Sequence, residues 1–177
     1  MIAASRVRRQ LLPALALVLL SGCSLVTPRA PRPGAPVTSA PAVAQVRGEA
    51  GSAIAATAAA LIGTPYEFGG ADVGGFDCSG LALYVYARAG IAIPRTAAEQ
   101  QRAAQPVPLG ELQPGDLVFF GMRAHRIDHV GVYLGGGRFV HAPHRGVAVS
   151  SADLASGYYA RHLVNAGRFV NAPLSSR

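Results

Sequence analysis

The chain has 177 residues, half of them apolar, with 16 arginines, no lysine, nine acidic residues and a formal net charge of +7. This length suffices for one domain of ordinary size and is too short for a large protein of several domains. From Gly51 onward ten arginines face eight acidic residues, so a basic surface that binds nucleic acid is disfavoured. The only cysteines are Cys23 and Cys78, which excludes a disulfide framework and a cysteine-rich zinc site.

The first 23 residues are typical of an export signal. Three arginines between Arg6 and Arg9 precede an apolar run over 11–20, which is too short to span a bilayer because about 20 residues are needed. We therefore predict a cleaved signal peptide over 1–22. The sequence Leu20-Ser-Gly-Cys23 resembles a bacterial lipobox, in which the cysteine becomes the lipidated first residue. An ordinary secretory signal cut nearby is the alternative.

Lipidation of Cys23 would anchor the protein durably, because several acyl chains hold a protein on a membrane better than one. By the same resemblance, Ser24 after the cysteine suits the outer membrane, facing the periplasm, of a bacterium with two membranes. Residues 23–50 then form a lipidated cysteine and a tether, since Pro, Ala, Ser, Thr and Arg dominate 24–48 without apolar periodicity. One domain remains, over 51–177.

Helices are predicted in the first half of that domain. The Ala-rich run 52–62 predicts a helix with Ser52 near its start and Gly63 at its end. After a loop rich in Gly and Pro, a buried helix over 78–89 is expected, with Asp77 as its N-cap and Gly90 as its stop. Thr96-Ala-Ala-Glu99 is a capping-box pattern that predicts a short helix over 97–104.

Strands are predicted in the second half. Short β-rich segments separated by Pro-Gly, Gly-Gly-Gly or Asp indicate an antiparallel meander, with strands at 117–120, 130–134, 138–141, 147–150 and 162–170. Helices followed by strands predict an α+β fold, with N-terminal helices packed on an antiparallel sheet.

Cys78 is the candidate nucleophile. Once Cys23 is used for lipidation, Cys78 is an unpaired thiol in an exported chain, which is a liability unless it is buried or used. Its predicted place in the first turn of a helix favours the nucleophilic thiolate. Gly75, Ser79 and Gly80 keep its surroundings small, so that a substrate backbone could approach. A buried structural cysteine is the alternative.

His129 and His141 are the candidate base and its orienting partner. They flank a hairpin whose turn holds three glycines, and a loop with an odd number of residues would place both rings on one face. We predict a three-residue loop and a shared face that is turned toward Cys78. His129 would then serve as the general base, and His141 would fix its tautomer.

The remaining histidines, His125, His144 and His162, are interpreted as structural residues. No cofactor is predicted. A zinc site at the histidine pair is set aside, because no third ligand has suitable spacing.

These features resemble the NlpC/P60 family of cell-wall cysteine peptidases, whose fold is a reduced papain-like one. The motifs that carry the resemblance cover about residues 62–143. In chain order they are Gly63-Thr-Pro-Tyr66, Phe68-Gly-Gly70, Gly75-Phe-Asp-Cys78-Ser-Gly80, Pro94-Arg-Thr96, Gln100, Pro114-Gly-Asp-Leu-Val-Phe-Phe120, His129-Val-Gly-Val-Tyr-Leu-Gly135 and Phe139-Val-His141.

The resemblance implies a Cys78, His129 and His141 triad, with the Tyr66 hydroxyl helping to bind the oxyanion. Phe68 stands where the family usually has Trp, a departure that affects the packing of the cleft rather than acyl transfer. The implied reaction is hydrolysis of peptidoglycan stem peptides through a thioacyl-enzyme, between γ-D-glutamyl and the diamino acid.

Such a substrate carries carboxylates, so arginines near the cleft could bind it, and Arg95, Arg123 and Arg126 are candidates. We expect a monomer that meets the membrane through its N-terminal lipid and does not bind nucleic acid. Two other functions stay open: a non-catalytic peptidoglycan-binding lipoprotein, and a thiol amidase or acyltransferase with the same fold.

Overall fold

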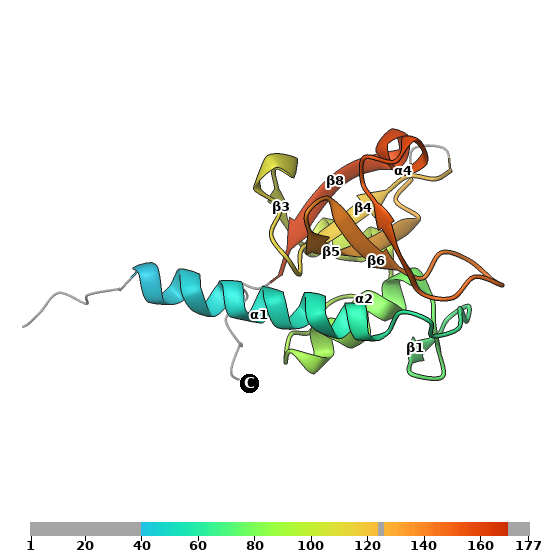
Figure 1. The fold of residues 1–177 in the computed structure, drawn as a ribbon, viewed down its shortest axis with the longest axis horizontal. Coiled ribbons are helices and arrows are strands. Elements are labelled where there is room, and N and C mark those ends of the chain that lie inside the picture. Colours follow the sequence, from blue (N-terminus) through green and yellow to red (C-terminus); the bar gives the residue numbers. More distant parts are fainter. Residues whose placement is uncertain (1–39, 124–125, 170–177) are drawn as a thin grey trace, which may run out of the picture. The chain divides into compact units, whose positions relative to one another are not determined.

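The computed structural model describes residues 40–123 and 126–169, and it has the α+β architecture that the sequence predicts (Figure 1). Helices α1 (Ala40–Ala60) and α2 (Cys78–Arg88) contact each other and strand β5 (His129–Gly135). The predicted signal peptide and Cys23 lie outside the described residues. Within those residues, no helix has the length and apolar character needed to cross a membrane.

Helix α1 begins twelve residues before the predicted start at Ser52, so the prediction of an extended tether up to residue 50 is wrong from Ala40 onward. Ser52 does not cap the helix, because its hydroxyl donates to the carbonyl oxygen of Gly48 one turn earlier (2.8 Å). The predicted end holds, since Gly63 adopts a φ of 94° just after the helix. Ile54 and Ala58 bury the helix against the core.

The loop between α1 and α2 folds back on itself and contains two short strands, β1 (Ala71–Asp72) and β2 (Gly75–Phe76). Gly80 in α2 lies so close to the carbonyl oxygen of Gly70 that a side chain at position 80 would collide with it. A side chain at Gly75 would likewise meet Glu67. These glycines therefore make room for the protein's own loop, which corrects the expectation that they leave space for a substrate backbone.

Helix α2 follows the prediction closely. The side chain of Asp77 caps it by accepting from the N–H of Gly80 (2.6 Å), and Gly90 follows its end with a φ of 75°. Helix α3 (Ala97–Ala103) has the complete capping box between Thr96 and Glu99. A 3₁₀ turn, η1 (Leu109–Glu111), comes next.

A six-stranded antiparallel sheet forms the second layer, in the order β3-β8-β4-β5-β6-β7. Its strands are β3 (Gln105–Val107), β4 (Leu117–Phe120), β5, β6 (Arg138–His141), β7 (Ser150–Asp153) and β8 (Leu163–Arg168). Strands β4 to β7 form the predicted meander, but β8 returns to pair with the other side of β4.

Two details of the C-terminal part differ from the prediction. Strand β7 begins three residues later than expected, because Val149 instead exchanges backbone hydrogen bonds with Gly63 and Thr64 (2.9 and 2.8 Å). Helix α4 (Gly157–His162), which the sequence did not predict, precedes β8.

The β5–β6 hairpin has the predicted odd number of unpaired residues, but not all of them lie in its loop. Gly135 pairs with Arg138, so only Gly136 and Gly137 lie between the strands, with φ of 59° and 78°. A register shift between Tyr133 and Gly135 inserts the extra residue instead. The prediction of a three-residue loop is thus wrong, because the loop has two residues. With the bulge the number of unpaired residues is still odd, so that His129 and His141 lie on one face.

The two faces of the sheet bury different clusters. Leu117, Phe119, Val130, Val132 and Val140 join the core under α1 and α2. The alternating residues of the same strands face the other way, where Val118, Phe120, Tyr133 and Phe139 pack with Tyr159 of α4. His129 and His141 share the parity of Tyr133 and Phe139, and so they belong to this second face.

Candidate active site

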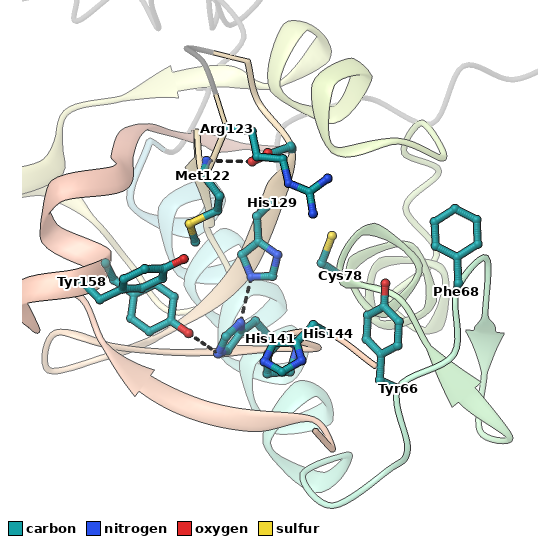
Figure 2. Close-up of a pocket in the computed structure, with 12 residues that line it drawn as sticks. Tyr66, Phe68, Cys78, Met122, Arg123, His129, His141, His144 and Tyr158 are labelled. Atoms are coloured by element: carbon teal, nitrogen blue, oxygen red, sulfur yellow. Dashed lines mark hydrogen bonds between the residues drawn. The ribbon is translucent and has the colours of Figure 1, made fainter. Parts of the chain in front are cut away.

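The four site residues predicted from the sequence line one pocket of about 570 Å³ (Figure 2). Cys78 comes from the start of α2, Tyr66 from the loop before it, His129 from the start of β5 and His141 from the end of β6. The whole lining is Tyr66, Phe68, Cys78, Met122, Arg123, Asp128, His129, His141, Pro143, His144, Tyr158 and Tyr159.

Cys78 is a half-buried free thiol, and Figure 2 shows its side chain beside the His129 ring in the pocket. Burial and then the adjacent Asp77 carboxylate raise the pKa of this thiol to about 11, although backbone N–H groups of Val130 and of the α2 N-terminus oppose the rise. The helix N-terminus thus acts in the predicted direction but is outweighed. The resting group is a thiol, not the thiolate that the sequence suggested.

Asp77 is fixed in a dense network beside the sulfur. Arg95 binds it with both terminal nitrogens (3.0 Å to Oδ1 and 2.7 Å to Oδ2), and the N–H of Gly69 donates to Oδ2 (3.1 Å). Burial raises the pKa of this carboxyl, but the hydrogen bonds from Arg95 and Gly80 outweigh burial, so that the pKa is lowered overall. Asp77 is therefore ionised, and Arg95 balances its charge.

Gln100, one of the motif residues, holds the other side of this turn. Its side chain is fully buried, and its Nε2 donates to the carbonyl oxygens of Ser79 (3.0 Å) and Pro94 (2.9 Å). The segment that carries Arg95 is thereby tied to the first turn of α2. The position of the Cys78 sulfur thus depends on both Asp77 and Gln100.

His129 and His141 share a face, as predicted, and are directly hydrogen bonded. Nε2 of His129 lies 2.8 Å from Nδ1 of His141, and the rings meet edge to face at 85°. Both residues are buried, with 6% and 2% of their surface exposed. Since Nε2 of His129 is engaged, Nδ1 is the nitrogen left for the sulfur, and Figure 2 shows that edge of the ring facing Cys78.

Burial also determines the charge of the histidines. Burial, with a smaller effect of His144, lowers the pKa of His129 to about 4, and burial followed by His129 and His144 lowers that of His141 to about 3. At neutral pH the pocket therefore holds a neutral thiol beside two neutral imidazoles. Proton transfer from Cys78 to His129 has to accompany attack on a substrate rather than precede it.

Tyr66 and Phe68 form the rim on the cysteine side. Figure 2 shows the Tyr66 hydroxyl directed toward Cys78, and burial followed by the nearby Cys78 and Asp77 raises the pKa of this phenol. It is therefore a neutral hydroxyl that can donate a hydrogen bond. Phe68 is 82% exposed, which places it on the pocket's edge and not in the core.

The sequence model of the NlpC/P60 family matches residues 63–168. The chain belongs to the NlpC/P60 family. It is 47% identical over 109 residues to the bifunctional muramidase/DL-endopeptidase CwlT of Bacillus subtilis, covering 60% of this chain and 32% of that protein. It is 46% identical over 114 residues to the murein DD-endopeptidase MepH of Escherichia coli, covering 62% of this chain and 42% of that protein.

Among solved structures, the NlpC/p60 domain of the peptidoglycan hydrolase SagA superposes with a TM-score of 0.59 at 36% identity. The match covers 67% of this chain and 97% of that domain. The chain thus corresponds to the NlpC/P60 part of its relatives and spans less than half the length of the two curated proteins. The resemblance found in the motifs is confirmed as family membership.

The NlpC/P60 pocket contains residues that sequence reasoning missed. The hydroxyl oxygen of Tyr159, on α4, lies 3.2 Å from Nε2 of His141, and the neighbouring Tyr158 also lines the pocket. Met122 and Asp128 come from the segment between β4 and β5. His144, interpreted as structural, also lines the pocket and is exposed. A short amphiphilic segment such as 157–162 carries no periodic signal that would have revealed its place.

The three candidate arginines fall in different environments. Arg95 is committed to Asp77, and Arg126 is exposed and does not line the pocket. Arg123 does line it, and its guanidinium points into the pocket in Figure 2. The structure therefore leaves Arg123 as the candidate for a substrate carboxylate.

Two further observations concern the remaining histidines and the arrangement of ligating side chains in the described part of the chain. His162 bonds the carbonyl oxygen of Tyr158 (2.7 Å) outside the pocket, and His125 lies outside the described residues. Across 40–123 and 126–169, no three His, Cys, Asp or Glu side chains gather as they would around a metal ion.

Proposed function

We propose that this NlpC/P60 protein is a cysteine endopeptidase that hydrolyses stem peptides of peptidoglycan. The observation that carries the proposal is the alignment of Cys78, His129 and His141 in one pocket, with Nε2 of His129 bonded to His141 and its Nδ1 side facing the sulfur. A thiol, a base within the same pocket and a group that orients the base are what nucleophilic acyl transfer needs. The relatives named as endopeptidases support the substrate class.

Acylation follows from this arrangement. As the Cys78 sulfur attacks the carbonyl carbon of the scissile amide, its proton passes to Nδ1 of His129 and the carbonyl oxygen becomes an oxyanion. The tetrahedral intermediate collapses when the C–N bond breaks, and His129 returns the proton to the departing amine. The product is a thioester on Cys78 and a free amino group on the peptide fragment.

Deacylation reverses the roles with water as the nucleophile. His129 accepts a proton from the water as its oxygen adds to the thioester carbon, and it returns that proton to the sulfur as the C–S bond breaks. The fragment leaves as a carboxylic acid. His141 stays hydrogen bonded to Nε2 throughout and stabilises the cationic ring that exists between the two transfers.

Tyr66 supports the oxyanion in this scheme. Its hydroxyl is directed toward the sulfur and is kept neutral by its raised pKa, so it can donate to a negative oxygen formed at the attacked carbon. Backbone N–H groups at the start of α2 are available as additional donors, because the first turn of a helix leaves them without intrahelical partners.

The bond between γ-D-glutamyl and the diamino acid is the proposed site of cleavage. The two curated relatives carry names for different linkages, DL for CwlT and DD for MepH, so the bond is the finer part of the proposal. Arg123 supports a substrate that presents a carboxylate on the histidine side of the pocket.

We also propose that Cys23 carries lipid and holds the domain on the outer membrane, facing the wall. The support is the lipobox-like sequence Leu20-Ser-Gly-Cys23 after an apolar run. The protein would then act as a monomer on peptidoglycan within reach of its anchor.

The decisive experiment compares Cys78→Ala with Cys23→Ser. Purified wall and defined muropeptides are digested, and the new termini are identified by mass spectrometry. We expect Cys78→Ala to release no fragments and Cys23→Ser to cleave like the wild type while no longer partitioning into a detergent phase. Full activity of Cys78→Ala would refute the thiol mechanism, and detergent partitioning of Cys23→Ser would refute the anchor.

A further inference from the structure

A tyrosine outside the predicted triad continues the hydrogen-bonded chain away from the sulfur. The hydroxyl of Tyr159 lies 3.2 Å from Nε2 of His141, whose Nδ1 is bonded to His129, and dashed lines in Figure 2 mark both contacts of His141. Tyr159 is carried by α4, and nothing in the NlpC/P60 motifs quoted above includes it.

The ring of Tyr159 is held firmly in place. It packs against Phe120 with ring centres 5.6 Å apart, against Phe139 at 5.0 Å and against His141 at 5.2 Å, each with an edge-to-face geometry. Aromatic pairs in this arrangement stabilise one another and restrict rotation. The hydroxyl is therefore presented to His141 by a fixed ring and not by a loose surface side chain.

The direction of each hydrogen bond in this chain decides whether His129 can act as a base. Neutral His129 has a free lone pair at Nδ1 only when its proton is on Nε2, from which it donates to Nδ1 of His141. Neutral His141 must then carry its own proton on Nε2. That N–H is buried with the residue, and a buried donor without an acceptor is costly.

The opposite arrangement disables the base. If His141 carried its proton on Nδ1, it would donate to Nε2 of His129, and the His129 proton would move to Nδ1, facing the thiol. A group that accepts from Nε2 of His141 therefore selects the productive arrangement of the whole chain. Besides His129, the groups near His141 are His144, Tyr158 and Tyr159, and the described contacts give only Tyr159 a bond to Nε2.

We infer that Tyr159 is a positioning residue whose hydroxyl accepts the Nε2–H of His141 and thereby keeps Nδ1 of His129 unprotonated for the Cys78 proton. This inference rests on the proposed function for its catalytic consequence. Its structural content, the tautomer of His141, does not depend on any activity.

The first test is the tautomer itself. Long-range ¹H–¹⁵N correlation spectra of the full chain distinguish protonated from unprotonated imidazole nitrogens. At neutral pH we expect His141 of the wild type to be protonated at Nε2 and bare at Nδ1. Tyr159→Phe should shift it toward the Nδ1–H form, whereas Tyr158→Phe removes a neighbouring hydroxyl and should leave the tautomer unchanged. A wild-type His141 protonated at Nδ1 would overturn the inference.

The second test is kinetic. Tyr159→Phe keeps the aromatic ring, and so the fold, while it removes one neutral hydrogen bond, and we expect kcat to fall about 10-fold with KM unchanged. Tyr84→Phe is the matched control, because Tyr84 lies on α2 outside the pocket and contacts Phe76 through its ring; it should keep the wild-type kcat. An unchanged kcat for Tyr159→Phe would contradict the inference, as would a change confined to KM.

Different results would refute the thiol mechanism and the role of Tyr159. If Cys78→Ala digests the wall as well as the wild type does, the thiol mechanism is wrong, yet the spectra of the wild type and of Tyr159→Phe still report on the His141 tautomer. If Cys78→Ala is inactive but Tyr159→Phe has neither an altered tautomer nor a lower kcat, the peptidase stands and the role of Tyr159 falls.

Discussion

The two sides of the pocket keep their reactive groups neutral in different surroundings. On the cysteine side charges are abundant and are balanced, since Asp77 next to the sulfur is bound by Arg95 and capped by backbone N–H groups. On the histidine side charge is avoided, because His129 and His141 lie among aromatic rings on the second face of the sheet. Burial keeps the reactive group neutral on both sides, but only the cysteine side has an ion pair next to that group.

Burial of both groups explains how an acid and a base can face each other without exchanging a proton at rest. Burial disfavours the imidazolium and the thiolate alike, so the pair stays neutral until a substrate supplies charge to stabilise. The different surroundings also mean that the two sides should respond to different perturbations. Low pH should destabilise the protein through the histidine side, whereas loss of the Arg95 guanidinium should change the cysteine side.

The largest expected effect is acid destabilisation through the histidine side. His129 and His141 have folded pKa values of about 4 and about 3, below the unfolded value near 6.5, so the unfolded chain binds more protons at intermediate pH. Their contribution to the free energy of unfolding is fully present above pH 6.5 and is lost as the pH falls toward 4 and below. The free energy of unfolding should drop by on the order of 3 kcal/mol across that window, as measured by urea titration.

Replacing one histidine isolates this contribution. His141→Gln should flatten the pH dependence of the free energy of unfolding between pH 4 and 6.5, since a glutamine does not titrate. His162→Gln, on α4 but outside the pocket, is the matched control and should retain the wild-type slope. Equal slopes for all three proteins would show that burial of the pair is not what drives acid unfolding.

The next effect breaks the balance on the cysteine side. Arg95→Gln leaves Asp77 ionised without its partner, and the pKa of the Cys78 thiol should rise because Asp77 already raises it. Asp77 has 15% of its side chain exposed and Arg95 38%, so we expect a loss of about 1 kcal/mol of stability, between that of a surface pair and a buried one.

Alkylation measures the change at the sulfur directly. In a Cys23→Ser background, the rate of reaction of Cys78 with iodoacetamide is followed against pH, and the titration should move to higher pH in Arg95→Gln. Arg88→Gln removes an exposed arginine from the other end of α2 and should leave the titration in place. An identical titration in all variants would mean that Arg95 does not shield the thiol from Asp77.

How much the sequence predicted also differs between the two sides. The cysteine side is built from local signals: Asp77 caps the helix that begins at Cys78, Thr96 and Glu99 form the expected capping box, and each signal spans a few residues. On the histidine side, parity alone placed His129 and His141 on one face, although a bulge and not a three-residue loop achieves it.

What could not be predicted depends on long-range contacts. Tyr159 is placed by packing on Phe120 and Phe139, which are 39 and 20 residues earlier in the chain, and no local pattern records that contact. The protonation state of Cys78 was also missed, because the helix N-terminus is visible in the sequence and burial is not. The early start of α1 was not predicted because the prolines of this segment suggested an extended chain. Pro41, however, lies in the first turn of the helix, where proline is tolerated, and Ala42, Ala44 and Gln45 after it are good helix formers.

The smallest expected effect concerns Arg123, a charged residue on the histidine side of the pocket. Arg123 lines the pocket on the histidine side, and among the described residues its guanidinium forms no ion pair, unlike that of Arg95. If it binds a substrate carboxylate, Arg123→Gln should raise KM about 5-fold, or about 1 kcal/mol, with kcat unchanged. Arg126→Gln, in the same segment but outside the pocket, is the control and should have the wild-type KM.

Amidated substrate distinguishes an ion pair from a general effect of charge. The wild type should bind a stem peptide with an amidated carboxylate more weakly than the free acid, and Arg123→Gln should bind both forms equally, because the interacting charge is absent from one partner or the other. Equal preference of the wild type for both peptides would remove Arg123 from substrate recognition.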